Sequence, residues 1–168
     1  MAMDTFMEAK KMKVLFVCTG NTCRSPMAEF LLRNKILKAG LAEKINVSSA
    51  GLAAMPGAKA SNNSIDVLKD EDIDLNEHES RQLTLELIES ADVVLTMTQQ
   101  HKSGIVNVIP EFNNKVFTLG EFAEVNIDVS DPFGGDKAIY QACFSQIEQL
   151  LNKAWSKLLA MKQETERL

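Results

Sequence analysis

The sequence predicts an α/β fold: an open parallel sheet with helices packed on both faces. Short apolar runs typical of buried strands alternate along the chain with amphipathic runs typical of helices, and this alternation favours a parallel sheet. The length of 168 residues, with 45% hydrophobic and 24% charged residues, suits one domain with a three-layer core. In such sheets ligands bind at the carboxyl ends of the strands, so a site is expected there.

Four segments are expected to form the strands. The first contains the continuous apolar run Val14-Leu15-Phe16-Val17, and Cys18 lies at its carboxyl end. The second leads into Ala50-Gly51. The expected strand ranges are residues 13–18, 45–49, 92–97 and 115–119.

The first helix is expected at residues 25–39, before Gly40 at a C-cap position. Ala28, Leu32 and Ile36 recur at helical spacing and should face the sheet. The intervening charged residues, Glu29 and Arg33, are expected to face water.

The other helices are indicated by caps and by periodicity. Thr84 can cap a helix through Ser90, and Thr98 can cap another that ends near Val106. A further helix is expected at residues 59–69. Apolar residues recur every three or four positions in a final amphipathic helix: Tyr140, Phe144, Ile147, Leu151, Trp155 and Leu158.

Two connections differ in what they predict. Residues 71–81 are polar and charged, which is typical of a surface connection. Residues 121–136 form a long irregular segment that contains Pro132 and the pair Gly134-Gly135. Irregular segments of this length in a compact domain are usually functional or mobile.

Composition and charge exclude several protein classes. A net charge of −5 offers no basic surface for nucleic acid or for an anionic membrane. Residues 1–12 lack the apolar core and cleavage site of a signal peptide, and we expect a disordered lead or an expression remnant. Residues 13–160 should form the single domain, with residues 161–168 as a helix end or tail. Three cysteines do not make the disulfide framework of a secreted protein, so a reducing, cytoplasmic setting is expected.

The loop from Cys18 to Arg24 has the features of an anion cradle. It lies between a strand and a helix whose first turn contains Pro26, so successive backbone N–H groups can point inward at the helix N-terminus. Arg24 supplies a planar fork suited to two phosphoryl oxygens. The same positive field favours the thiolate of Cys18, which would then be a nucleophile aimed at phosphorus.

The run from Cys18 to Ser25, followed by Pro26-Met27-Ala28-Glu29, resembles the phosphate loop of the low-molecular-weight protein tyrosine phosphatase family. Asp131-Pro132-Phe133 stands where that family carries its general acid, and the resemblance covers residues 13 to about 157. It implies a four-stranded sheet in the order 2-1-3-4. Thr22 makes the loop similar to the protein arginine phosphatase branch, because the tyrosine-directed branch usually has an aliphatic residue there and Asp-Pro-Tyr at the acid.

The resemblance implies a two-step reaction. Cys18 would attack phosphorus and form a phosphocysteine, and Asp131 would protonate the leaving atom and then act as base on water. Ser25 could donate a hydrogen bond to the thiolate. From spacing alone, Asp131 is equally consistent with a turn residue before proline, and the resemblance favours the acid. The phosphoryl oxygens would be held by the Arg24 side chain and the N–H groups of Thr19, Gly20, Asn21, Thr22, Cys23 and Arg24.

Three supporting residues have more than one interpretation. Asn21 and Ser49 could hydrogen-bond across the site, which the resemblance supports, whereas the residues alone favour a solvated loop and a strand end. Cys23 is either a resolving cysteine for oxidised Cys18 or a small buried side chain beneath the loop. Cys143 is expected in the core.

The leaving group depends on Thr22 and Phe133. A phosphotyrosine pocket needs apolar walls for a flat ring, whereas the Thr22 hydroxyl and the Asp131 carboxylate can accept hydrogen bonds from a guanidinium. The sequence has one Tyr and one Trp, so aromatic walls would have to come from Phe. The preference for arginine rests mainly on the resemblance.

The predicted function is therefore a cysteine-dependent phosphoprotein phosphatase, with phosphoarginine as the preferred substrate and inorganic phosphate as product. The alternatives are a phosphotyrosine or aryl phosphatase, a small-molecule acid phosphatase, a thiol-dependent arsenate reductase of the same fold, and a phosphosite-binding module without catalysis. No cofactor, metal, nucleic acid or membrane partner is expected. His78 and His101 lack ligand-spaced neighbours and are expected to be surface or capping residues.

Overall fold

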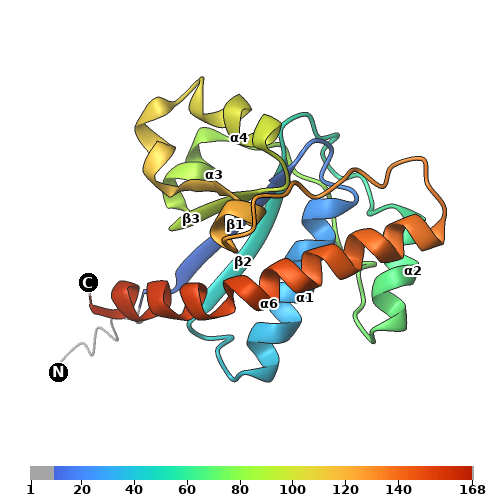
Figure 1. Ribbon diagram of the computed structural model, residues 1–168, viewed down its shortest axis with the longest axis horizontal. Helices are drawn as coiled ribbons and strands as arrows, with labels where there is room; N and C mark the ends of the chain where they lie inside the picture. The colour runs from blue at the N-terminus through green and yellow to red at the C-terminus, as the bar shows by residue number, and fades with distance from the viewer. Residues whose placement is uncertain (1–9, 168) are drawn as a thin grey trace, which may run out of the picture.

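Four parallel strands form the sheet of the computed structural model, which describes residues 10–167. The spatial order is β2-β1-β3-β4, so the order implied by the resemblance is confirmed (Figure 1). The strands are β1 (Met12–Cys18), β2 (Ile45–Gly51), β3 (Val93–Thr96) and β4 (Val116–Thr118).

Helices cover both faces of the sheet, as expected (Figure 1). Helices α1 and α6 pack on one face, with α2 against α6, and helices α3 and α4 pack on the other. The helices are α1 (Arg24–Lys38), α2 (Asn62–Asp70), α3 (Leu85–Ser90), α4 (Gln99–Val106), the 3₁₀ turn η1 (Pro110–Lys115), α5 (Leu119–Phe122) and α6 (Lys137–Arg167). None of the helices within residues 10–167 is long and apolar enough to span a bilayer.

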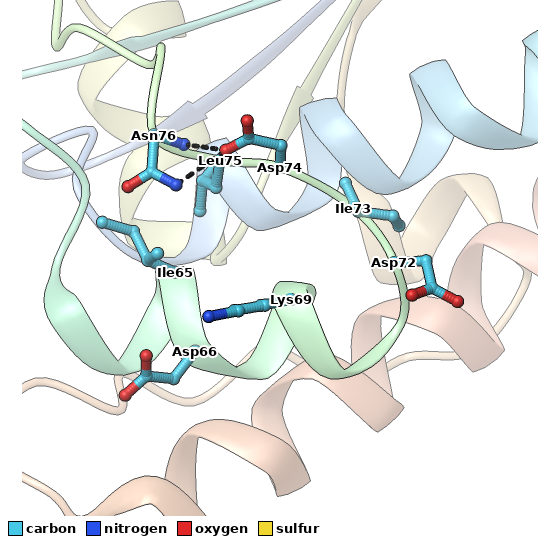
Figure 2. A pocket seen from close by; sticks show the side chains of 8 residues that line it. All are labelled: Ile65, Asp66, Lys69, Asp72, Ile73, Asp74, Leu75 and Asn76. Atoms are coloured by element: carbon cyan, nitrogen blue, oxygen red, sulfur yellow. Dashed lines mark hydrogen bonds between the residues drawn. The ribbon is translucent and has the colours of Figure 1, made fainter.

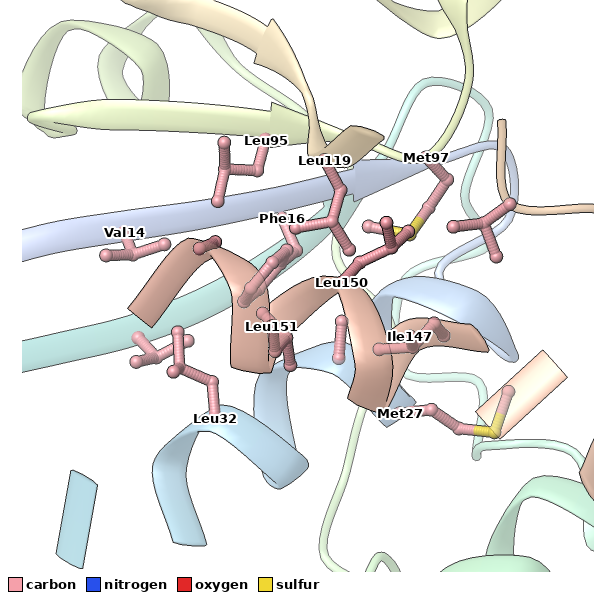
Figure 3. Close-up of a cluster of buried hydrophobic side chains, with 14 of the residues drawn as sticks. Val14, Phe16, Met27, Leu32, Leu95, Met97, Leu119, Ile147, Leu150 and Leu151 are labelled. Carbon is pink, nitrogen blue, oxygen red and sulfur yellow. The ribbon is translucent and has the colours of Figure 1, made fainter. Parts of the chain in front are cut away.

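The central strand β1 divides its side chains between two cores because successive strand residues point to opposite faces. Val14 and Phe16 enter the larger core, and Leu15 and Val17 enter the smaller one beneath α3 and α4. Figure 3 shows Phe16 in the larger core with side chains from both covering helices, among them Leu32 of α1 and Ile147, Leu150 and Leu151 of α6.

The register brings three strand ends together. Cys18 of β1 lies opposite Gly51 of β2, and Val17 lies opposite Thr96 of β3. The chain leaves β1 toward α1 and β2, while β3 lies on the other side of β1. This is the switch point of the sheet, where a crevice for a ligand is expected.

Some element boundaries differ from those predicted. Strand β1 begins at Met12, which is fully buried, and residues 1–9 of the expected lead lie outside the described residues. Helix α2 begins at Asn62 rather than residue 59, because Ser61 is its N-cap and Lys59 is bridged to Glu79. The final helix continues past residue 160 as far as Arg167.

Candidate active site

Cys18 ends β1, and helix α1 begins six residues later at Arg24, so the phosphate-loop candidate spans the gap between them. The Cys18 side chain is only 3% exposed, and its Sγ lies 2.8 Å from Ser25 Oγ. Ser25 Oγ also accepts a hydrogen bond of 2.8 Å from Asn21 Nδ2. Because that bond occupies the oxygen as an acceptor, the Ser25 hydroxyl proton is left for the sulfur of Cys18.

Asn21 holds the loop in a left-handed backbone conformation with φ of 58°. Asparagine adopts this conformation more readily than most residues. Its side chain is fully buried and is held from both ends: Nδ2 donates to Ser49 Oγ at 2.9 Å, and Oδ1 accepts from Arg81 N at 3.0 Å. The proposed contact between Asn21 and Ser49 is thus present in the structure.

The loop also lies tightly against the end of β2. A Cβ atom at Gly51 would lie 2.5 Å from the carbonyl oxygen of Thr19 and 3.1 Å from the Asn21 nitrogen. Only glycine leaves room for this approach. Ala50-Gly51 was expected only as the end of the second strand, and its close approach to the loop was not predicted.

The expectation that Glu29 faces water is wrong. Glu29 is buried, and its carboxylate accepts a 2.6 Å hydrogen bond from Ser49 Oγ and contacts the half-exposed Arg33 guanidinium. A buried carboxylate is tolerated when it is paired in this way. Helical spacing could not show this, because one partner comes from β2.

The expectation that His78 is a surface or capping residue, in a surface connection at 71–81, is also wrong. His78 is buried, and its Nε2 donates to the Asn21 carbonyl oxygen at 2.7 Å. Ser80 Oγ donates to the same oxygen at 2.8 Å. Ile73 and Leu75 are buried as well, so this connection packs beneath the loop.

His101 is likewise buried, with 5% of its surface exposed, instead of lying on the surface. Its Nε2 lies 2.9 Å from Thr19 Oγ1. Burial and, to a smaller extent, the nearby Arg24 guanidinium together lower the pKa of His101 to about 4, against smaller opposing effects of Asp128 and Asp131. The capping expectation applies to its backbone alone, since Thr98 Oγ1 accepts from His101 N.

Arg24 links the loop to the irregular segment before α6. Its guanidinium is buried; Nη1 donates to the Val129 carbonyl oxygen at 3.1 Å, and Nη2 lies 3.6 Å from Asp131 Oδ2. The Asp131 side chain is 56% exposed, and its Oδ1 accepts from Phe133 N at 3.1 Å. Asp131 therefore initiates a turn with one oxygen and faces Arg24 with the other.

A pocket of about 250 Å³ opens above the loop. Phe133, which is 80% exposed, stands at its rim. The side chains of Asn21, Ser25 and Ser49 are buried and do not line the pocket. The pocket is lined by Cys18, Thr19, Gly20, Thr22, Cys23, Arg24, Asp131 and Phe133.

Cys23 and Cys143 are both buried free thiols, as Cys18 is. Cys23 Sγ lies 3.3 Å from the Tyr140 hydroxyl and donates to Ser61 Oγ at 3.5 Å. These contacts hold the thiol among neighbouring side chains. Its redox role remains a prediction. Burial raises the pKa of Cys143 to about 12, so this core thiol stays protonated.

A second hollow, of about 560 Å³, is larger but chemically different (Figure 2). It lies between α2 and residues 72–76, and its lining includes Lys69, Asp66 and Asp74. The Asp74 side chain turns back to accept hydrogen bonds from Asn76, as Figure 2 shows. The lining of this second hollow contains no cysteine and no residue that ends a strand.

The pocket above the loop therefore combines the Cys18 thiol, a fixed guanidinium, a helix N-terminus and a carboxylate. Together these groups can bind a phosphoryl group, attack it and protonate its leaving atom. Within residues 10–167 no three His, Cys, Asp or Glu side chains gather as a metal site.

Comparison with known proteins agrees with this chemistry. The family described as low molecular weight phosphotyrosine protein phosphatase matches residues 13–165. A protein-arginine-phosphatase of Bacillus subtilis is 47% identical over 143 residues, which are 84% of this chain and 93% of that protein. The low molecular weight protein-tyrosine-phosphatase PtpB of Staphylococcus epidermidis is 35% identical, over 84% of this chain and 96% of its own. A structure of the YwlE arginine phosphatase, a mutant with a phosphorylated active-site serine, superimposes with a TM-score of 0.83 and 45% identity, covering 88% of this chain and 95% of that one.

Proposed function

This chain belongs to the low molecular weight phosphotyrosine protein phosphatase family, and from that premise we propose that it hydrolyses phosphoarginine in proteins through a phosphocysteine. The observation that carries the proposal is the convergence of Cys18, Arg24 and Asp131 on one pocket with Thr22 in its wall. The 47% identity to a protein-arginine-phosphatase supports the choice of substrate.

In the first step, the Cys18 thiolate attacks phosphorus, so that a P–S bond forms as the P–N bond to the guanidine breaks. Asp131 gives its proton to the departing nitrogen. The Arg24 fork and the N–H groups of residues 19–24 hold the three equatorial oxygens throughout.

In the second step, water attacks the phosphocysteine. Asp131, now a carboxylate, takes a proton from the water, and the P–S bond breaks to release inorganic phosphate and the Cys18 thiolate. The Ser25 hydroxyl, already bonded to Asn21 as an acceptor, donates to the leaving sulfur and stabilises its charge.

The substrate preference is assigned to the pocket wall. Thr22 offers its hydroxyl oxygen, and Asp131 offers the carbonyl oxygen of its carboxyl group, as acceptors for guanidinium N–H groups. An apolar side chain at position 22 would leave such donors unpaired, at a cost of about 1–3 kcal/mol per buried group. The exposed ring of Phe133 can pack beside the flat guanidinium.

Phosphotyrosine is the second candidate, favoured by the same Phe133 ring, which could equally stack on a phenol. The relative from Staphylococcus epidermidis, described as a tyrosine phosphatase, is 35% identical. Both candidate reactions would use Cys18, the loop donors and Asp131. They differ only in whether the pocket wall fits a guanidinium or an aromatic ring.

The test compares two peptides of one sequence that carry phosphoarginine or phosphotyrosine. The wild type should prefer phosphoarginine, and Thr22→Ile should shift the ratio of kcat/KM toward phosphotyrosine by roughly 10–100-fold. Thr22→Val keeps the shape of threonine without its hydroxyl, and Thr22→Ser keeps the hydroxyl on a smaller side chain. Together the two variants separate the effect of the hydroxyl on substrate preference from the effect of side-chain bulk. A wild type that prefers phosphotyrosine would reject the arginine assignment and keep the phosphatase chemistry.

A further inference from the structure

Thr19, the residue directly after the nucleophile, is held from two sides. Its carbonyl oxygen accepts a 2.9 Å hydrogen bond from Ala53 N, in the segment that follows β2. Its side-chain Oγ1 lies 2.9 Å from Nε2 of the buried His101, in the first turn of α4. Thr19 itself lines the pocket. A buried imidazole is therefore in contact with a hydroxyl that borders the pocket.

The imidazole of His101 is neutral under physiological conditions. Burial and the Arg24 guanidinium of α1 both disfavour the imidazolium, and the carboxylates of Asp128 and Asp131 in the segment before α6 compensate only in part. A neutral imidazole has one N–H donor and one bare nitrogen acceptor. The direction of the hydrogen bond to Thr19 depends on which nitrogen carries the proton.

The second ring nitrogen determines that choice. Nδ1 of His101 is buried and has no hydrogen-bond partner among residues 10–167. A proton on Nδ1 would create a buried N–H without an acceptor, and such orphaned donors are rare in folded proteins. A proton on Nε2 instead places the ring's single N–H in its one hydrogen bond, the bond to Thr19.

We infer that His101 is a positioning residue whose Nε2–H donates to Thr19 Oγ1, so that the Thr19 hydroxyl proton is directed to an acceptor in the pocket. The acceptor that the proposed function supplies there is an oxygen of the phosphoryl group. Thr19 thus adds a side-chain donor to the backbone donors of the loop. The inference rests on the proposed function for the identity of that acceptor, but the tautomer does not depend on it.

The tautomer can be measured in the resting enzyme by long-range ¹H–¹⁵N correlation of histidine-labelled protein, with His101→Gln used for assignment. We expect a neutral ring with the proton on Nε2 from about pH 6 to pH 8, with and without inorganic phosphate. A proton on Nδ1, or an imidazolium at about pH 6, would overturn the inference.

Variants test the consequence for binding. Thr19→Val removes the hydroxyl while keeping the shape, and His101→Leu removes the donor; each should weaken inorganic phosphate binding and lower kcat/KM by about tenfold. Thr19→Ser and His101→Gln retain a hydroxyl and an N–H, and each should recover most of the loss. The double variant should be no worse than either single variant, because both remove one interaction.

Additive losses, or an unchanged phosphate affinity in Thr19→Val, would contradict the inference. If His101→Leu does not fold, the Thr19 pair and the tautomer still decide the question. Calorimetric titration with inorganic phosphate needs no turnover, so a wild type inactive on both phosphopeptides would reject the proposed function alone.

Discussion

The phosphate loop and the segment that carries Asp131 meet in one pocket but are held very differently. Asn21 in the loop is fully buried and hydrogen-bonds to Ser25, Ser49, His78, Ser80 and Arg81. The segment that carries Asp131 is anchored through Val129, whose N–H donates to the Met97 carbonyl oxygen and whose own carbonyl oxygen accepts from Arg24. Two residues later, Asp131 is 56% exposed and Phe133 is 80% exposed.

The difference follows from what each region does in the proposed reaction. The phosphoryl oxygens carry negative charge in both steps, so their donors must be in place beforehand, which requires a rigid loop. The acid exchanges a proton with two different partners, first the leaving nitrogen and then a water molecule. An exposed turn next to a fixed anchor can serve both partners.

The largest effect is expected from Cys18→Ser. A serine hydroxyl is not ionised at neutral pH, so turnover should fall to background while the loop donors still bind phosphate or vanadate. Intact mass spectrometry tests whether a phosphoserine is trapped at position 18. Cys143→Ala is the matched control, because that buried thiol stays protonated and should leave turnover near wild type. Turnover of Cys18→Ser at the wild-type rate would remove the nucleophile from the mechanism.

Asp131→Asn should give the next largest effect. General acid catalysis is worth roughly 10²–10⁴-fold when the leaving group needs a proton, so kcat should fall by that factor on poor leaving groups and less on activated aryl phosphates. Asp128→Asn is the control, since Asp128 Oδ1 accepts from Gln99 N at the start of α4. Equal losses on both kinds of substrate would make Asp131 a turn residue only.

Substitutions in the two regions should differ in stability. Asn21→Gly keeps the left-handed backbone but loses the side-chain hydrogen bonds, so the free energy of unfolding should fall by about 1–3 kcal/mol. Asn21→Ala should lose about 1–2 kcal/mol more through backbone strain. Phe133→Ala should stay within about 0.5 kcal/mol of wild type, because its ring is exposed. Urea unfolding measures all three, and a large loss in Phe133→Ala would erase the contrast between the regions.

A separate effect concerns pH. The pKa of His101 is about 4 in the folded protein and 6.5 in a model compound, so the unfolded state binds more protons between these values. The contribution of His101 to stability is therefore present above about pH 6.5 and is lost as the pH falls toward 4. Urea unfolding at several pH values should show a shallower acid loss in His101→Gln than in wild type. Parallel curves would mean that the His101 pKa is not depressed.

The sequence predicted what local patterns determine. The loop of Cys18 was identified from its strand, its glycine and its proline, and Thr84 and Thr98 act as N-caps in the structure as expected. The strand order came from resemblance. Patterns of apolar residues could not predict the buried polar network, because its partners are distant: Asn21 and His78 are 57 residues apart, and Thr19 and His101 are 82 apart.

Helix α6 has a practical consequence. Its first turns lie at the site, where Tyr140 touches Cys23, and its last turns lie near Lys44, which pairs with Glu166 at 3.1 Å. A helix of 31 residues is about 46 Å long, so its two ends are far apart (Figure 1). A surface tether, a fluorophore or a fusion partner attached at the C-terminal end of α6 would therefore lie far from the pocket. Immobilised through that end, the protein should keep its pocket open to large phosphoprotein substrates.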